Sequence, residues 1–99
     1  MNFEISSETT IDVRNFFRNC GYHIHDDRRA KQQSFVRRLS SNFYPRFHIY
    51  LKSETKDKII CSLHLDQKKV KLGKQIIHAG DYDNDLLKEE IQRIQANLA

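Results

Sequence analysis

The stretch of sequence that decides the fold is residues 46–66, RFHIYLKSETKDKIICSLHLD. Its apolar residues fall at odd positions on both sides of a polar middle: Phe47, Ile49, Leu51, Ile59, Cys61, Leu63 and Leu65. Because alternate residues of a strand share one face, this pattern predicts a β-hairpin whose odd face meets the core. Because the core-facing residues of both strands are odd-numbered, the residue numbers of each directly opposed pair must add up to an even value, and this sum identifies the register. A sum of 112 places the turn near Lys56 and His48 opposite His64, and sums of 110 or 114 make the two histidines diagonal neighbours.

The even face of the predicted hairpin carries polar groups of several kinds. Its residues are Arg46, His48, Tyr50, Lys52, Ser62, His64 and Asp66. We expect this face to point to solvent or to a ligand, with helices against the apolar face. Ile60 is the exception among the even positions, and it indicates a bulge, an edge contact or a partly covered face.

The composition predicts one folded domain, residues 1–99, with a modest core. The chain is 38% hydrophobic and 30% charged, with three glycines and one proline, which disfavours disorder. It has no apolar run of the roughly 20 residues that span a bilayer and no signal-peptide pattern at its start, so we expect a cytoplasmic protein without a membrane role. Cys20 and Cys61 show no CxxC spacing and are expected to be buried, reduced thiols.

Basic charge is concentrated in the middle of the chain. Residues 28–75 contain thirteen basic and three acidic residues, whereas 1–27 and 76–99 each contain two basic and five acidic ones. A polyanion is the natural partner of such a distribution, and nucleic acid fits better than membrane because no basic amphipathic helix is present. The alternative is a solvated basic face that keeps the domain soluble.

Helical spacing before the hairpin predicts a first helix that a hydroxyl at Thr9 or Thr10 caps and Gly21 ends. Residues 22–25 are expected to form a short strand. Residues 28–39 have a weaker pattern and are predicted to be either a helix or an extended segment.

After the hairpin, residues 74–78 are a candidate third strand. A final helix is predicted from about residue 84 to 98, with Asp83 or Asp85 as its cap. The predicted fold class is therefore α+β: a small antiparallel sheet of two to four strands with helices packed on one face, roughly in the order α-β-(α)-β-β-(β)-α.

Three short motifs resemble the HicA family of small RNA-cleaving toxins: FFRNCGY at 16–22, FHIY at 47–50 and CSLH at 61–64. The resemblance leaves out residues 26–45. It implies a double-stranded-RNA-binding-domain-like α-β-β-β-α fold, with His48 matching the catalytic histidine of that family. The chain departs from the family where Arg46 and Phe47 replace a glycine and a serine.

The leading functional prediction is a small basic domain that binds nucleic acid, with RNA favoured, through the polar face of the hairpin. Basic side chains would hold phosphates while tyrosines stack on bases. The predicted binding residues are Arg37, Arg38, Tyr44, Arg46, Lys52, Lys68, Lys69 and Lys71.

Three alternatives remain open from the sequence. The first is a metal-independent ribonuclease with catalytic His48, His64 and Tyr50, since imidazoles titrate near neutral pH and serve as acid or base. The second is a zinc site with His48, His64, Asp66 and His78 as candidate ligands, or with His23 and His25, which share one strand face. It lacks the usual tight ligand spacing, so no metal or cofactor is predicted. The third is a protein-interaction module, or a homodimer formed through an unpaired hairpin edge, without a nucleic-acid role.

Overall fold

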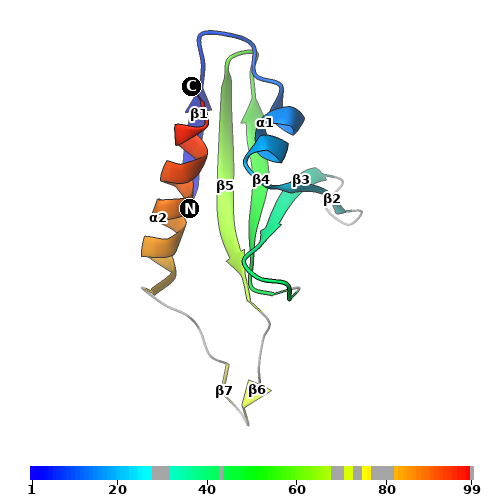
Figure 1. The fold of residues 1–99 in the computed structure, drawn as a ribbon, viewed down its shortest axis with the longest axis vertical. Helices are drawn as coiled ribbons and strands as arrows, with labels where there is room; N and C mark the ends of the chain where they lie inside the picture. The colour runs from blue at the N-terminus through cyan, green and yellow to red at the C-terminus, as the bar shows by residue number, and fades with distance from the viewer. Residues whose placement is uncertain (28–31, 43, 68–70, 73–74, 77–81, 99) are drawn as a thin grey trace.

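The computed structural model describes residues 1–27, 32–42, 44–67, 71–72, 75–76 and 82–98. Its elements in chain order are β1 (Asn2–Ser6), α1 (Val13–Asn19), β2 (His23–Asp27), β3 (Gln32–Arg38), β4 (Arg46–Glu54), β5 (Lys58–Asp66), β6 (Lys71–Leu72), β7 (Gln75–Ile76) and α2 (Tyr82–Ala96). Five antiparallel strands form one sheet in the order β1-β5-β4-β3-β2, and β6 pairs with β7 separately. Both helices lie on one side of the five-stranded sheet (Figure 1). The α+β class predicted from the sequence is therefore confirmed.

The predicted hairpin is formed by β4 and β5 in the register that sums to 112. His48 lies opposite His64, and Phe47 lies opposite Leu65. A bulge after Leu51 shifts the register. Beyond it, Ile60 lies between Ser53 of β4 and Glu4 of β1, which accounts for an apolar residue at an even position.

The predicted strand count was wrong, because the main sheet has five strands rather than two to four. Residues 2–6 add an edge strand, β1, that buries Phe3 and Ile5 against β5. The helix considered for 28–39 is a strand, β3, over its described part, and Phe35 pairs there with Ile49 of β4. The candidate third strand near 74–78 is reduced to β7, which pairs only with β6 among the described residues.

The ends of both helices differ from the predicted caps. Asp12, not a threonine, caps α1, since its carboxylate accepts from the backbone N–H of Asn15 at 3.3 Å. Gly21 ends this helix as predicted, at a φ of 95° that favours glycine. Helix α2 starts at Tyr82, so Asp83 and Asp85 lie inside the helix rather than at its cap.

The core fills the space between the helices and the odd face of the hairpin. Its buried apolar residues come from both helices and from the sheet: Phe3, Ile5, Val13, Phe17, Cys20, Tyr22, Phe35, Phe47, Ile49, Ile59, Cys61, Leu63, Leu87 and Ile94. Both cysteines are free thiols inside it, as the sequence predicts. Within the described part of the chain, neither helix has the length and apolar character that a bilayer crossing requires.

A buried carboxylate ties α2 to the rest of this layer. Glu90 is only 4% exposed, and it accepts hydrogen bonds from the Tyr22 hydroxyl at 2.6 Å and from the Arg93 guanidinium at 2.6 Å. Arg93 also donates to the backbone carbonyl of Cys20 at 2.7 Å. Burial raises the pKa of Tyr22, and the hydrogen bond to Glu90 raises it further. The cluster thus fixes α2 against the end of α1.

Replacing this carboxylate by an amide tests its structural role. We expect Glu90→Gln to lower the free energy of unfolding by about 2 kcal/mol, because buried donors lose a charged acceptor. Glu89→Gln, at the exposed neighbouring position, is the matched control and should change stability by less than about 0.5 kcal/mol. Urea denaturation followed by circular dichroism measures both, and equal effects of the two substitutions would contradict the assignment.

Candidate functional site

The face of the sheet turned away from the helices holds every histidine that the structure describes. His23 and His25 come from β2, and the strand registers align them with β4 and β5. One row across the strands contains His23, Val36, His48 and His64. The next row contains His25, Ser34, Tyr50 and Ser62. The face is polar because the core requires only the odd positions of the hairpin.

His48 lies at the centre of this face and is held at both ring nitrogens. Its Nδ1 is 2.9 Å from Oδ2 of Asp66, and its Nε2 is 2.8 Å from Oγ of Ser34. The Ser34 hydroxyl also donates to the backbone carbonyl of His25 at 3.2 Å. The two ring nitrogens therefore link β4 to β5 through Asp66 and to β3 through Ser34. With 4% of its surface exposed, His48 organises the face rather than presenting a nitrogen to a ligand.

Asp66 has two hydrogen-bonding partners. Besides His48, Nε of Arg46 approaches Oδ2 of Asp66 at 3.3 Å. The hydrogen bond from His48 lowers the pKa of Asp66, against the raising effect of burial, and Arg46 lowers it further. The guanidinium of Arg46 also lies over the ring of Tyr44, 5.0 Å from its centroid. This carboxylate therefore stays ionised and holds β4 and β5 side chains in place.

Four rings form a continuous line across the face. The His25 and His48 ring centroids are 5.7 Å apart, and the Tyr50 ring is stacked on His48 at 4.2 Å and 26°. His64 continues the line, with its ring centroid 5.6 Å from that of Tyr50. We call these four residues the ring row. It presents aromatic surface from β2, β4 and β5 on a part of the sheet that neither helix covers.

His64 ends the ring row and is exposed. Its Nε2 lies 2.9 Å from Oγ of Ser62, which is itself buried. Partial burial lowers the pKa of His64, and the positive charges of the Met1 ammonium, His48 and Lys52 act in the same direction, while Asp66 opposes them. His64 is therefore a neutral imidazole at physiological pH.

The three predicted catalytic residues, His48, His64 and Tyr50, lie together in the ring row. The structure leaves their catalytic role a prediction. It also shows a partner for this row that the sequence analysis did not select, Ser34, and it adds His25 to the row. The alternation of His23 and His25 along one strand was the available signal, because it places both imidazoles on the same face.

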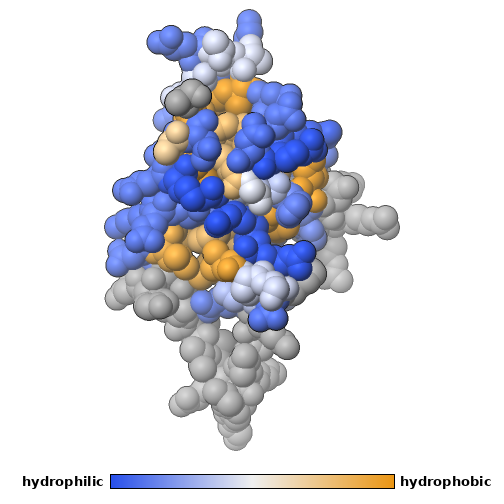
Figure 2. All heavy atoms as spheres, in the orientation of Figure 1, coloured by the Kyte–Doolittle hydropathy of each residue, from blue (hydrophilic) through white to orange (hydrophobic). Residues whose placement is uncertain are grey.

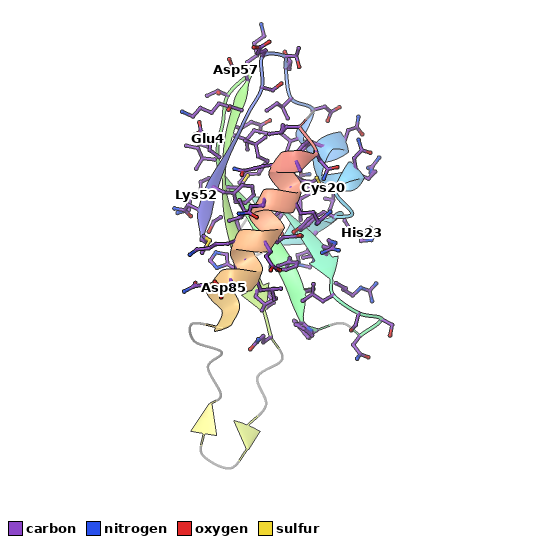
Figure 3. The ribbon with its side chains drawn as sticks, turned by 60° about the vertical axis from the view of Figure 1, so that its left-hand side comes forward. Glu4, Cys20, His23, Lys52, Asp57 and Asp85 are labelled. Carbon is purple, nitrogen blue, oxygen red and sulfur yellow. The ribbon has the colours of Figure 1, made fainter. Side chains whose placement is uncertain are left out.

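The predicted binding residues are spread over both faces. Arg46 pairs with Asp66 and lies over the ring of Tyr44, and Arg38 and Lys52 are exposed. In Figure 3, Lys52 projects from the sheet on the side away from α2. Arg37 lies on the helix side, where its guanidinium contacts Glu90 at 3.4 Å. Two more lysines, Lys68 and Lys69, fall outside the described residues, and Lys71 lies in β6, where its side chain is not described.

Among the described residues, no group of three or more His, Cys, Asp or Glu side chains is arranged to hold a metal ion. His78, considered as a zinc ligand from the sequence, lies outside those residues. The side chains of the ring row instead bind one another and their hydroxyl and carboxylate neighbours. The described chemistry of the face is thus aromatic and hydrogen-bonding.

The helix side offers a different kind of surface. A cavity of about 260 Å³ lies between α1, β3 and β4. Asp12 and Glu54 contribute carboxylates to its lining, together with one guanidinium, from Arg14. On this side of the molecule, apolar atoms are visible on the surface between polar side chains (Figure 2). Such a lining does not favour a polyanion, which directs attention to the face of the ring row.

Comparisons of the chain with protein-family models, with curated proteins and with solved structures found no match. The resemblance to the HicA family accordingly stays an expectation from the sequence motifs.

The pKa of Asp66 gives a prediction about stability. Its folded pKa lies below the ordinary 3.8, so the stabilisation is present above that value and is lost as the pH falls through the folded pKa. We expect Asp66→Asn to lower the free energy of unfolding by about 1 kcal/mol at pH 7, with a smaller deficit at pH 3. Asp57→Asn in the exposed hairpin turn is the control. Urea denaturation at both pH values measures the difference, and a deficit independent of pH would contradict the ion pair.

The titration of His64 is a second measurable quantity. An ordinary histidine is half protonated at pH 6.5, and the lowered pKa keeps the His64 ring mostly neutral there. We expect its ring resonances in two-dimensional NMR to shift with a midpoint below 6.5. A midpoint at or above that value would show that the described surroundings of the ring do not persist in solution.

Proposed function

We propose that the protein binds single-stranded nucleic acid on the polar face of its sheet. The observation that carries this proposal is the ring row, His25–His48–Tyr50–His64, with its centroid separations of 5.7, 4.2 and 5.6 Å. Proteins hold single strands by stacking bases on aromatic side chains, and each such contact contributes about 1–3 kcal/mol. Tyr50 is the central element of this platform because it touches the rings on both sides.

The charges around the row support a polyanionic ligand. The carboxylates of Asp66 and Glu4 on this face are paired: Asp66 with His48 and Arg46, and Glu4 with Lys58 at 2.9 Å. Lys52 is exposed and close enough to influence the pKa of His64. A phosphate backbone running beside the rings would therefore meet positive charge and few opposing carboxylates.

The shape of the face favours a single strand over a duplex. The rings lie on the broad surface of the sheet, where a planar base can stack only if it is not already stacked within a double helix. The helices, which in many proteins enter the major groove, pack on the opposite side of the sheet (Figure 1). Unpaired bases are thus the chemically matched ligand.

Within this proposal the buried residues have a positioning role. His48 is fixed by Asp66 and Ser34, and the Tyr50 ring stacks on it at 4.2 Å. A ring that is already ordered loses less conformational entropy on binding than a mobile one. The Ser34–His48–Asp66 network therefore prepares Tyr50 for the ligand without contacting the ligand itself.

The stacking role of Tyr50 is directly testable. We expect Tyr50→Ala to weaken binding of a fluorescein-labelled oligouridylate 12-mer about tenfold, which corresponds to roughly 1.4 kcal/mol. Tyr50→Phe keeps the ring and should bind within about twofold of the wild type. Fluorescence anisotropy gives the affinities, and circular dichroism checks that both variants are folded. If Tyr50→Ala binds the strand as tightly as Tyr50→Phe and the wild type do, the proposal is contradicted.

A charge reversal tests which face meets the phosphates. We expect Lys52→Glu to weaken binding and to reduce the slope of log affinity against log salt by about one. Lys88→Glu, at an exposed position of α2 on the helix side, is the matched control and should leave the slope nearly unchanged. Anisotropy titrations between roughly 50 and 300 mM salt, where screening of charges changes strongly, measure both slopes. Equal effects of the two charge reversals would show that the ligand binds elsewhere.

A further inference from the structure

We infer that His64 makes this face select RNA over DNA by hydrogen-bonding the 2′-hydroxyl of a bound nucleotide through its Nδ1 atom. The inference rests on the proposed function and specifies its ligand as single-stranded RNA. Nothing in the ring row itself distinguishes the two nucleic acids, because every base offers the same kind of aromatic face. Discrimination needs a group that meets the sugar.

His64 is placed to meet a sugar. It stands at the end of the ring row, with its ring centroid 5.6 Å from that of Tyr50, so the ribose of a base stacked on Tyr50 would lie within its reach. His64 is also exposed, whereas His48 on the adjacent strand is buried and engaged at both nitrogens. Of the two opposed histidines, only His64 has a ring that a ligand can reach.

The hydrogen bonds of His64 leave one nitrogen for that ligand. Its Nε2 is taken by the hydroxyl of Ser62 at 2.9 Å, and no described residue hydrogen-bonds its Nδ1. If Nε2–H donates to Ser62, Nδ1 is an acceptor; if Ser62 donates to Nε2, Nδ1–H is a donor. A 2′-hydroxyl both donates and accepts, so it matches Nδ1 in either tautomer. The hydrogen at C2′ of DNA matches neither.

The charge state of the ring supports discrimination. A protonated imidazole would attract the phosphates of RNA and DNA alike, because both carry the same backbone charge. The burial and neighbouring cations that lower the pKa of His64 keep its ring neutral near pH 7. Its contribution then depends on the geometry of a hydrogen bond rather than on charge. One neutral hydrogen bond of this kind corresponds to a preference of about fivefold.

The test compares three 12-mers that share one base: oligouridylate, oligodeoxyuridylate and 2′-fluoro oligouridylate. The fluorinated strand keeps an RNA-like sugar pucker but lacks the hydroxyl. We expect the wild-type protein to bind oligouridylate about fivefold more tightly than either analogue, measured by anisotropy competition at pH 7.5. His64→Phe keeps a ring beside Tyr50 and removes both nitrogens, and it should bind all three strands with the affinity that the wild type shows for the deoxy strand.

The matched control is His23→Phe. It changes an exposed histidine on the same face that lies outside the ring row, on β2, three strands away from His64 on β5. It should keep the preference for oligouridylate. Equal wild-type binding of all three strands would overturn the inference and leave the proposed function standing. A preference that persists in His64→Phe, or a fluorinated strand that binds like RNA, would also overturn it. Failure of every strand to bind the wild type would remove the proposed function itself.

Discussion

The ladder between β4 and β5 is the constraint on which the other parts of the structure depend. Each strand of this pair is largely apolar on one face and polar on the other, and the register brings like faces together from Arg46 to Leu51, before the bulge. Both helices and the flanking strands pack core residues against the apolar face, around residues such as Ile49 and Leu63. The polar face is then left without a covering helix. Core formation and exposure of the ring row are two consequences of one alternation.

An uncovered polar face still needs internal order, because buried polar groups without partners destabilise a fold. Ser34 and His48 are buried although no helix lies above them, and each finds its hydrogen-bonding partners on the neighbouring strands. Asp66 completes the network from β5. The same contacts that satisfy these groups hold Tyr50 against His48. Under the proposed function, the hydrogen bonds that stabilise this face also order Tyr50 for a ligand.

This arrangement divides the predicted catalytic residues into two kinds. His48 is enclosed and fixed, whereas His64 is exposed and Tyr50 is half-buried between them. Direct opposition of two histidines across a hairpin is therefore not by itself an acid–base pair. Access to solvent, set by the neighbouring strands rather than by the hairpin, separates a positioning residue from one that can meet a ligand.

The sequence alone determined the elements that carry a strong local signal. Strict alternation predicted the β4–β5 hairpin and placed its two histidines on one face, while the structure decided their register. Gly21 marked the end of α1, because side-chain period and backbone freedom are local properties. The final helix followed from its apolar spacing, although its first turn begins earlier than predicted.

Only the tertiary structure decided the remainder. The segment that forms β3 has mixed periodicity, and it is a strand because β2 and β4 pair with it on both sides. That pairing places the His25 ring next to the His48 ring and the Ser34 hydroxyl within hydrogen-bond distance of His48, although these residues are distant in sequence. The five-residue β1 is defined by its ladder with β5. Such contacts depend on strand order and register, which arise from the packing of the whole chain and not from the preference of any one segment.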